Sequence, residues 1–348
     1  MVVRRSDVAR LAGTSPSVVS YVLNDGPRRV APETRARVLA AIEELGYRPD
    51  PIARSLALRR TQTLGLVVPD LADPVFGRLA RAVEDAALDR GYRLLVGSAL
   101  DDPGRQAAYI RDFVDRRVDG LVIVPGAAED AAEVPTEVAV PWVALGRQSD
   151  TGVAVRVDDR EVGRQAARHL VEHGRRVIAC LAGPAESRSV RERVKGWREV
   201  RAETGMDARV HYVAAGPRSA YDRARRLLTE RTDVDALFVA SDQQAIGALR
   251  AIADVGLRCP DDVAVVAADG LPEVEYVAPS LTTVAQPFTD LGRTAVERLL
   301  ARLDPAPATP SAAGSQPSVL PASAEDVVLP ATLLVRESCG CVMRVEPV

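Results

Sequence analysis

The first stretch with regular hydrophobic spacing, residues 4–24, predicts two short helices separated by a turn at Gly13. Apolar residues recur at helical spacings, so each helix has one face that can pack on the other. Ser15 and Pro16 mark the start of the second helix, because serine is a favoured N-cap and proline is tolerated at the first helical position. The residues expected to pack are Val8, Leu11, Ala12, Val19, Val22 and Leu23.

This arrangement places Pro16, Ser17, Ser20 and Tyr21 on the outer face of the second helix. In a helix-turn-helix, that face is presented to the DNA major groove. The alternative is a three-helix structural domain that binds no nucleic acid.

From residue 61 onward, short apolar runs alternate with longer helical stretches. This alternation predicts parallel sheets covered on both faces, and its length indicates two lobes. In open α/β sheets, ligands bind at the carboxyl ends of the strands, which we expect to face a cleft between the lobes. The predicted strands are 64–69, 92–96, 120–124, 177–181, 236–239 and 263–267, and the predicted helices are 76–90, 105–116, 162–172, 193–203, 220–228 and 245–255.

Charge is distributed unevenly between these parts. Residues 1–60 contain eleven arginines and six acidic residues, a net charge of +5, whereas the whole chain carries −3. A basic head on an acidic body is what attraction to DNA phosphates requires.

Neither nucleotide-binding loops nor catalytic constellations stand out. No Gly-x-Gly-x-x-Gly follows a strand, and no phosphate-binding Gly-Lys-Ser/Thr loop is present. The adjacent aspartates at 101–102, 158–159 and 261–262 lie beside Pro, Gly or Arg, which favours turns and helix starts over acid–base pairs. We therefore expect no catalytic residue, no cofactor and no enzymatic activity.

The four cysteines do not form a recognisable framework. Cys180 lies in an apolar run, which is typical of a buried thiol. Cys339 and Cys341 could bind a metal only with partners elsewhere, and the three histidines (169, 173 and 211) show no matching ligand spacing, so no metal site is expected. With no apolar run of about 18 residues and no signal-peptide pattern, we expect a cytoplasmic protein outside the membrane.

Several strings resemble the lactose-repressor (LacI/GalR) family of bacterial transcription factors. In the head these are DVARLAG (7–13), VSxVLN (19–24), PETRxRVxxAIEELGYxP (32–49) and ARSL (53–56). In the core they include GLVVP (65–69), RVDGL (117–121), RVKGW (193–197), AIGA (245–248), DVAVV (262–266) and LTTV (281–284).

The resemblance implies an all-α helix-turn-helix head and an α/β core like periplasmic binding proteins, with two parallel-sheet lobes. We divide the chain into a head (1–46), a hinge with a short helix (47–60), an N-lobe (61–157 and 287–303) and a C-lobe (158–286 and 326–340). The remaining segment, 304–325, is rich in Pro, Ala and Ser and is predicted to be a disordered loop.

The resemblance further implies a sequence-specific regulator, most simply a repressor, that binds double-stranded operator DNA as a homodimer. The hinge, 51–58, spans about two helical turns, too short to be stable alone, and is expected to fold over the minor groove with Leu56 as an apolar wedge. The expected DNA-contacting residues are Ser15, Pro16, Ser17, Val18, Ser20, Tyr21, Asn24, Tyr47, Ala53, Arg54, Ser55 and Leu56.

The family also implies a small-molecule effector between the lobes. Arg193 and Asp269 match the family's ligand-binding arginine and acid, and Asp73 and Phe76 match the region after the first strand. The full expected set is Asp73, Phe76, Arg147, Arg191, Arg193, Arg218, Ser241, Asp242 and Asp269.

Some positions depart from the family's usual pattern. Gly146 and Gly270 replace acids, Ser241 replaces an asparagine, and Arg218 replaces an aromatic residue, which together favour a carboxylated effector over a neutral sugar. In the head, Tyr21 replaces the arginine that reads guanine, and Ala31 replaces a serine cap.

Two other classes remain as alternatives. The core could be a secreted solute-binding protein or a sugar-modifying enzyme that carries a DNA-binding head. The basic head and the lack of a signal-peptide pattern argue against the first, and the lack of a catalytic constellation argues against the second.

Overall fold

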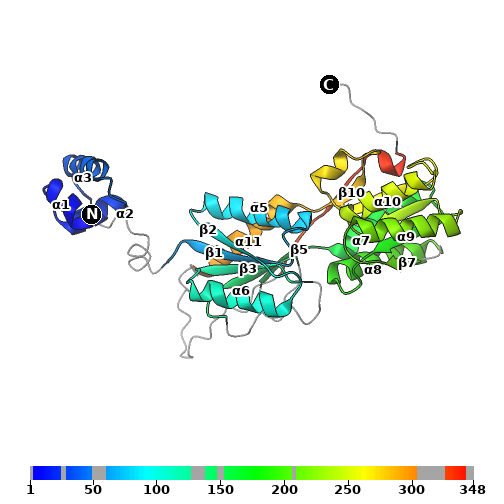
Figure 1. Ribbon diagram of the computed structural model, residues 1–348, viewed down its shortest axis with the longest axis horizontal. Coiled ribbons are helices and arrows are strands. Elements are labelled where there is room, and N and C mark those ends of the chain that lie inside the picture. Colours follow the sequence, from blue (N-terminus) through cyan, green and yellow to red (C-terminus); the bar gives the residue numbers. More distant parts are fainter. Residues whose placement is uncertain are drawn as a thin grey trace, which may run out of the picture. The chain divides into compact units, whose positions relative to one another are not determined.

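The computed structural model describes residues 3–24, 29–48, 60–126, 138–146, 153–205, 209–303 and 326–341. The chain separates into two compact units, Met1–Thr61 and Gln62–Val348. Figure 1 shows the small helical unit and the larger α/β unit. Among the described residues, no helix combines the length and the apolar character needed to span a membrane.

The head consists of α1 (Arg5–Leu11), α2 (Pro16–Asn24) and α3 (Pro32–Leu45). The predicted cap of α2 is confirmed, because the Ser15 hydroxyl accepts a hydrogen bond from the Val18 amide at 3.4 Å. Helix α3 begins after Ala31, which makes no side-chain cap bond, and ends at Gly46 in the left-handed conformation.

The packing of α1 and α2 is largely as predicted. Val8, Ala12, Val19 and Val22 are buried in one cluster, where they meet residues of α3. Leu11 is a correction, because its side chain is 46 % exposed. The helical spacing alone does not decide which edge of an apolar face the third helix covers.

The core unit contains two six-stranded sheets. The first has the order β11-β5-β4-β3-β1-β2 and is parallel throughout. Its strands are β1 (Thr63–Val68), β2 (Arg93–Ser98), β3 (Gly120–Ile123), β4 (Trp142–Leu145), β5 (Val153–Val157) and β11 (Val327–Leu329).

The second sheet has the order β12-β10-β9-β8-β6-β7, and only the edge strand β12 is antiparallel to its neighbour. Its strands are β6 (Ile178–Ala182), β7 (Val210–Tyr212), β8 (Ala236–Val239), β9 (Ala264–Asp269), β10 (Thr282–Ala285) and β12 (Thr332–Leu334). The predicted parallel α/β fold class is therefore confirmed.

Helices cover both faces of each sheet (Figure 1). Those of the first sheet are α5 (Pro74–Asp89), α6 (Pro103–Asp115) and α11 (Phe288–Leu303). Those of the second are α7 (Asp159–Glu172), α8 (Arg188–Glu203), α9 (Pro217–Glu230) and α10 (Asp242–Asp254), with the short 3-10 helices η2 (Pro272–Glu275) and η3 (Glu337–Cys339).

The chain passes between the two sheets three times. It leaves the first after β5, returns after β10 into α11, and crosses again between β11 and β12. The assignment of residues 326–340 to the C-lobe is therefore wrong in part, because β11 pairs with β5 in the first sheet. Strands of three residues carry too little pattern to reveal which sheet they join.

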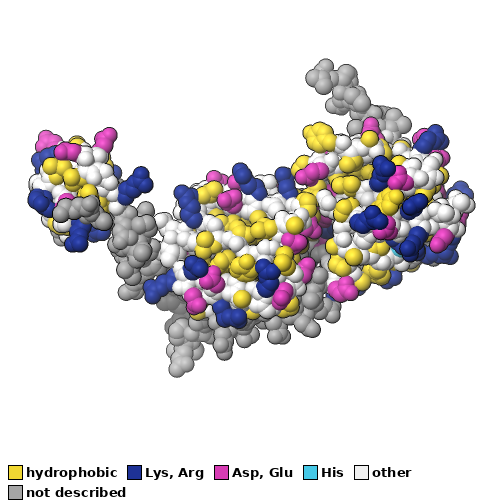
Figure 2. Space-filling view, in the orientation of Figure 1, with side chains coloured by type: hydrophobic (Ala, Val, Ile, Leu, Met, Phe, Trp, Pro, Cys, Tyr) yellow, Lys and Arg dark blue, Asp and Glu magenta, His cyan; other side chains and the backbone are white. Residues whose placement is uncertain are grey.

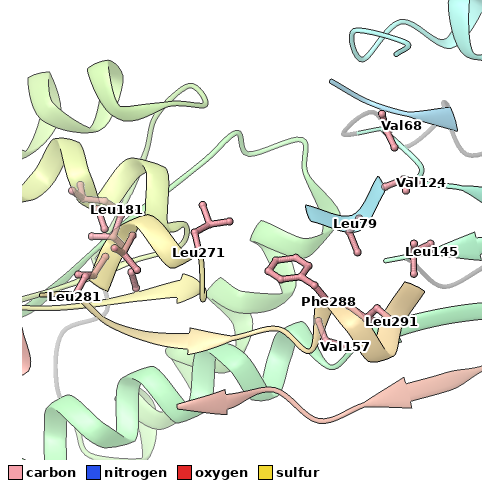
Figure 3. Packing of buried hydrophobic residues seen from close by; sticks show 14 of the residues in the cluster. Val68, Leu79, Val124, Leu145, Val157, Leu181, Leu271, Leu281, Phe288 and Leu291 are labelled. Atoms are coloured by element: carbon pink, nitrogen blue, oxygen red, sulfur yellow. The ribbon is translucent and has the colours of Figure 1, made fainter. Parts of the chain in front are cut away.

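The hydrophobic core lies on the faces that the helices cover. Figure 3 shows Phe288 at the start of α11 close to Leu79 of α5 and Leu291, with Leu181 and Leu281 gathered at the second sheet. Because neither lobe is continuous in sequence, this packing joins segments that are far apart along the chain.

Candidate functional site

The outer face of α2 is the candidate DNA-reading surface. Pro16 and Ser17 are exposed, and Val18, Ser20 and Tyr21 are partly exposed. Nothing in the described head covers this face, which matches the geometry of a recognition helix. The hinge residues Ala53, Arg54, Ser55 and Leu56 and the side chain of Asn24 lie outside the described residues.

Tyr47 does not share this surface. It follows α3 and is 8 % exposed, packed in the cluster that contains Val8, Val19 and Val38. Its aromatic ring therefore closes the head's core, and its assignment as a DNA contact stays a prediction. The sequence alone does not show whether Tyr47 faces the DNA or the head's core, and the three-helix packing shows that its ring is buried.

The first helix of the head carries exposed positive charge. Arg4, Arg5 and Arg10 precede or belong to α1, and all three are exposed. Arg10 is paired with Asp7, so part of this charge is neutralised within the head. Exposed arginines of this kind suit contacts to phosphates, which fix the register of a protein on DNA without reading bases.

In the core, Arg193 of α8 lies at the centre of a buried polar network. Its Nε donates to Asp159 Oδ1 at 2.9 Å, and its Nη1 donates to Asp269 Oδ1 at 2.8 Å and to the Ala240 carbonyl at 2.7 Å. The side chain is 6 % exposed. Burial lowers the pKa of Arg193, but the nearby Asp269 and Asp159 raise it by more, so the guanidinium stays charged.

Close packing of two helices brings these partners together. Asp159 begins α7, and α8 carries Arg193 beside it. A Cβ atom on Gly163 would collide with the Arg193 carbonyl, and one on Gly196 would collide with the Arg160 carbonyl. The two glycines therefore permit the backbone contact that holds Arg193 against Asp159.

Asp269 ends β9 in a strained conformation. Its φ of 123° is a value that residues with a Cβ rarely adopt, and such strain persists only where surrounding contacts enforce it. Besides Arg193, the side-chain Nε2 of Gln286 donates to Asp269 Oδ1 at 2.9 Å. Burial raises the pKa of Asp269, while Arg193 and Gln286 oppose that rise.

Asp73 brings a carboxylate from the first lobe toward this network. It caps α5, accepting a hydrogen bond from the Val75 amide at 2.9 Å. Burial raises the pKa of Asp73, and repulsion from Asp269 adds to the increase. Phe76, one turn into α5, is partly buried against the hydrophobic core.

Ser241 and Asp242 stabilise the start of α10 and the loop after β9 through hydrogen bonds. Ser241 caps α10. The Asp242 carboxylate is buried and accepts hydrogen bonds from the Leu271 amide and the Thr283 hydroxyl, both at 2.7 Å. Both hydrogen bonds are internal to the protein, and Asp242 is close enough to Asp269 for the two carboxylates to repel each other.

Burial, followed by repulsion from Asp269, raises the pKa of Asp242 to about 7. The folded protein therefore holds a proton here between about pH 4 and pH 7 that the unfolded chain releases, so stability should fall as pH rises through this window. One proton corresponds to a slope of up to about 1.4 kcal/mol per pH unit. We expect Asp242→Asn to flatten this dependence in denaturant titrations, and Asp85→Asn, an exposed control, to retain it.

Two of the residues expected to bind effector, Arg218 and Arg191, lie outside the Arg193 network. The Arg218 side chain is 85 % exposed, pairs with Asp222 and lies over the Tyr221 ring, all on α9. Arg191 donates to the carbonyls of Ala185 and Glu186, on the loop before α8. Neither residue belongs to the buried network, so their role in effector binding stays a prediction, and Arg147 lies outside the described residues.

The sequence prediction missed Asp159 and Gln286. Asp158, not Asp159, is the N-cap of α7, which confirms the predicted helix start but leaves the Asp159 carboxylate for Arg193. Gln286 follows β10 by one residue and had no separate signal beyond its closeness to the LTTV string. Spacing along the chain could not reveal either contact.

A cavity of about 300 Å³ adjoins the network at Asp159. Elements of both sheets line it, since Gly146 follows β4, Val328 belongs to β11, and Ser189 belongs to α8. Its walls carry both signs of charge, from Arg156, Arg160, Arg188, Asp158, Asp159 and Glu192.

One cysteine pair lies beside a histidine, contrary to the expectation from sequence spacing. The ligand atoms of His169, Cys339 and Cys341 all lie within 4.8 Å of one another, and all four cysteines are free thiols. Burial raises the pKa of Cys339, but hydrogen bonds from His169, Thr282 and Cys341 outweigh it and lower the pKa to about 6.

Comparison with known proteins places both units in one family. The pattern described as bacterial regulatory proteins, lacI family, matches residues 6–50, and that of a periplasmic binding protein-like domain matches residues 167–339. The HTH-type transcriptional repressor PurR of Erwinia tasmaniensis is 36 % identical over 308 residues, covering 85 % of this chain and 89 % of that protein.

Solved structures agree. The lac repressor dimer bound to operator and the anti-inducer ONPF has a TM-score of 0.84 at 28 % identity, over 97 % of this chain and 99 % of that one. The complex of the transcriptional regulator CelR with cellobiose has a TM-score of 0.68 at 32 % identity, over 97 % and 99 %. The chain therefore belongs to the LacI family of bacterial regulatory proteins, transcription regulators with a DNA-binding helix-turn-helix head and an effector-binding core.

Proposed function

We propose that this protein represses transcription in the cytoplasm by binding an operator as a homodimer, and that a hydroxyl-rich metabolite held between its lobes controls that binding. The observation that carries the proposal is the Arg193–Asp159–Asp269 network, with Asp73 of the other lobe electrostatically close to Asp269. The protein binds its effector and does not convert it.

The charge of the network bears on the class of effector. The carboxylates of Asp159 and Asp269 already pair with the Arg193 guanidinium, and Asp73 adds a third carboxylate that repels Asp269. A carboxylated ligand would add a negative charge to this excess, whereas hydroxyl groups can donate to carboxylates directly. Arg218 is exposed and already pairs with Asp222, which weakens the argument for an anionic effector, and we favour a neutral sugar or similar polyol.

The first sheet offers a surface for the second subunit. Its edge strand β2 exposes Leu95 and Val96, and Leu71, Leu88 and Leu100 are exposed nearby in sequence. Figure 2 shows hydrophobic side chains gathered on this face of the first lobe. An exposed apolar edge strand favours aggregation unless a partner covers it, and a second copy of the chain would do so.

The test has two stages. Duplexes selected from a random pool by the purified protein should be retained in gel shifts against a large excess of random competitor. Neutral sugars, with cellobiose and ribose as first probes, should then be titrated against that complex beside sugar acids. Lack of any sequence preference contradicts the repressor, and a response to sugar acids alone contradicts the neutral effector.

Tyr21 should give the operator a distinctive base preference. An arginine can make a bidentate contact to guanine, whereas tyrosine offers one hydroxyl and a ring. We expect Tyr21→Arg to shift one position of each half-site toward guanine, with discrimination of about 1–3 kcal/mol. Selection from random duplexes measures this shift. Ala40→Arg, on the exposed part of α3, adds the same charge and should leave the selected sequence unchanged.

A further inference from the structure

Three potential metal ligands lie together where the C-terminal end of the described chain meets α7. His169 lies near the end of α7, and Cys339 and Cys341 flank Gly340, where η3 ends. The Cys341 Sγ is 3.4 Å from His169 Nε2, although the two residues are 172 positions apart. Nothing in the DNA-binding or effector-binding arrangement uses this cluster.

The backbone around the cysteines is firmly held. The Ser338 hydroxyl donates to the Val265 carbonyl at 2.7 Å and accepts from the Thr282 amide at 2.8 Å. Gly340 has a φ of 82°, which reverses the chain directly between the two thiols. His169 is 6 % exposed and its ring lies 4.3 Å from that of His173, so its position is also restricted.

The distances suit one small cation. Zinc binds thiolate at about 2.3 Å and imidazole at about 2.0 Å, so its ligands in a tetrahedral site are about 3.5–3.8 Å apart. The three ligand atoms already lie within 4.8 Å of one another. Small rotations of the two cysteine side chains would close that difference, and water or a fourth side chain would complete the coordination.

We propose that His169, Cys339 and Cys341 form a binding site for a thiophilic cation, zinc(II) or copper(I), that fastens the C-terminal segment to α7. Two thiolates and one imidazole are soft or intermediate ligands that select these ions over magnesium or calcium. Two thiolates also balance the charge of a zinc ion. Binding releases any proton that the two thiols still hold, because only deprotonated cysteines coordinate metals.

The test uses the full chain, reduced with a phosphine that does not chelate metals and stripped of metal. We expect it to take one zinc per chain from a chromophoric chelator, to release protons on binding, and to give thiolate charge-transfer absorption with cobalt(II). A parallel competition for copper(I) distinguishes the two ions. Bound zinc should also raise the midpoint of thermal unfolding, because a ligand that binds only the folded state stabilises it.

Cys341→Ser and His169→Gln should each weaken zinc binding by more than about 100-fold, since even outer-shell changes cost roughly 10- to 100-fold. Cys341 is partly exposed, so its variant should fold, which circular dichroism checks. His211→Gln on β7 and Cys180→Ala on β6 change the same two residue types outside the three ligands and serve as matched controls. Absence of binding by the reduced protein, or equal affinity in all variants, would overturn the proposal.

Discussion

Replacing Arg193 by alanine is expected to destabilise the core by about 3–5 kcal/mol, because it leaves the Asp159 and Asp269 carboxylates buried without their cation. The same change should abolish the response to effector. Denaturant titration measures the first effect, and calorimetry of the selected effector with the folded variant measures the second.

Two further variants separate the charge effect from loss of side-chain packing. Adding Asp269→Asn to Arg193→Ala removes one uncompensated charge, and the double variant should recover part of the lost stability, a coupling that the double-mutant cycle measures. Arg191→Ala, on the same helix, should have little effect. If Arg193→Ala and Arg191→Ala prove equally mild, the network does not have the energetic role assigned to it.

Leu56→Ala is expected to remove most of the specific affinity for operator while leaving non-specific binding intact. Specific binding exceeds non-specific binding by roughly 10³- to 10⁷-fold in proteins of this kind, and a hinge wedge that bends the duplex contributes to that margin. Gel-shift titrations with the selected operator and with random DNA, at several salt concentrations, measure both.

The non-specific component provides the internal control for this variant. Leu56→Ala retains every arginine of the head, so the affinity for random DNA and its steep decrease with salt should match those of the unaltered protein. Leu39→Ala, an exposed leucine of α3, changes the same side chain away from the hinge. Unchanged operator affinity in Leu56→Ala would exclude the wedge.

Sequence patterns were sufficient where periodicity or caps were strong. The helix after Ser15 begins where its predicted cap placed it, and α7 begins at Asp159, three residues before the predicted start. Strands β1, β3, β6 and β8 match the predicted apolar runs closely, whereas β4 and β5 were not predicted. Short strands such as β7, β11 and β12 were not predicted, because three residues cannot display a period and depend on neighbours for their pairing.

The candidate effector site was predictable only in part. Arg193 and Asp269 were identified through motifs, but their mutual ion pair depends on the close approach of α7 and α8. Arg218 lies apart from the Arg193 network, which the sequence could not show, because a charged residue looks the same in sequence whether it faces solvent or a ligand. The His169–Cys341 contact joins two distant segments that no local spacing links.

The three passages between the sheets give the buried network a mechanical role. Asp159 follows the first passage by one residue, and Gln286, which donates to Asp269, lies within the second. Rotation of one lobe against the other must change backbone torsions at these same places. A ligand that displaced the Gln286 side-chain amide from Asp269 would therefore act directly on a segment that connects the two lobes.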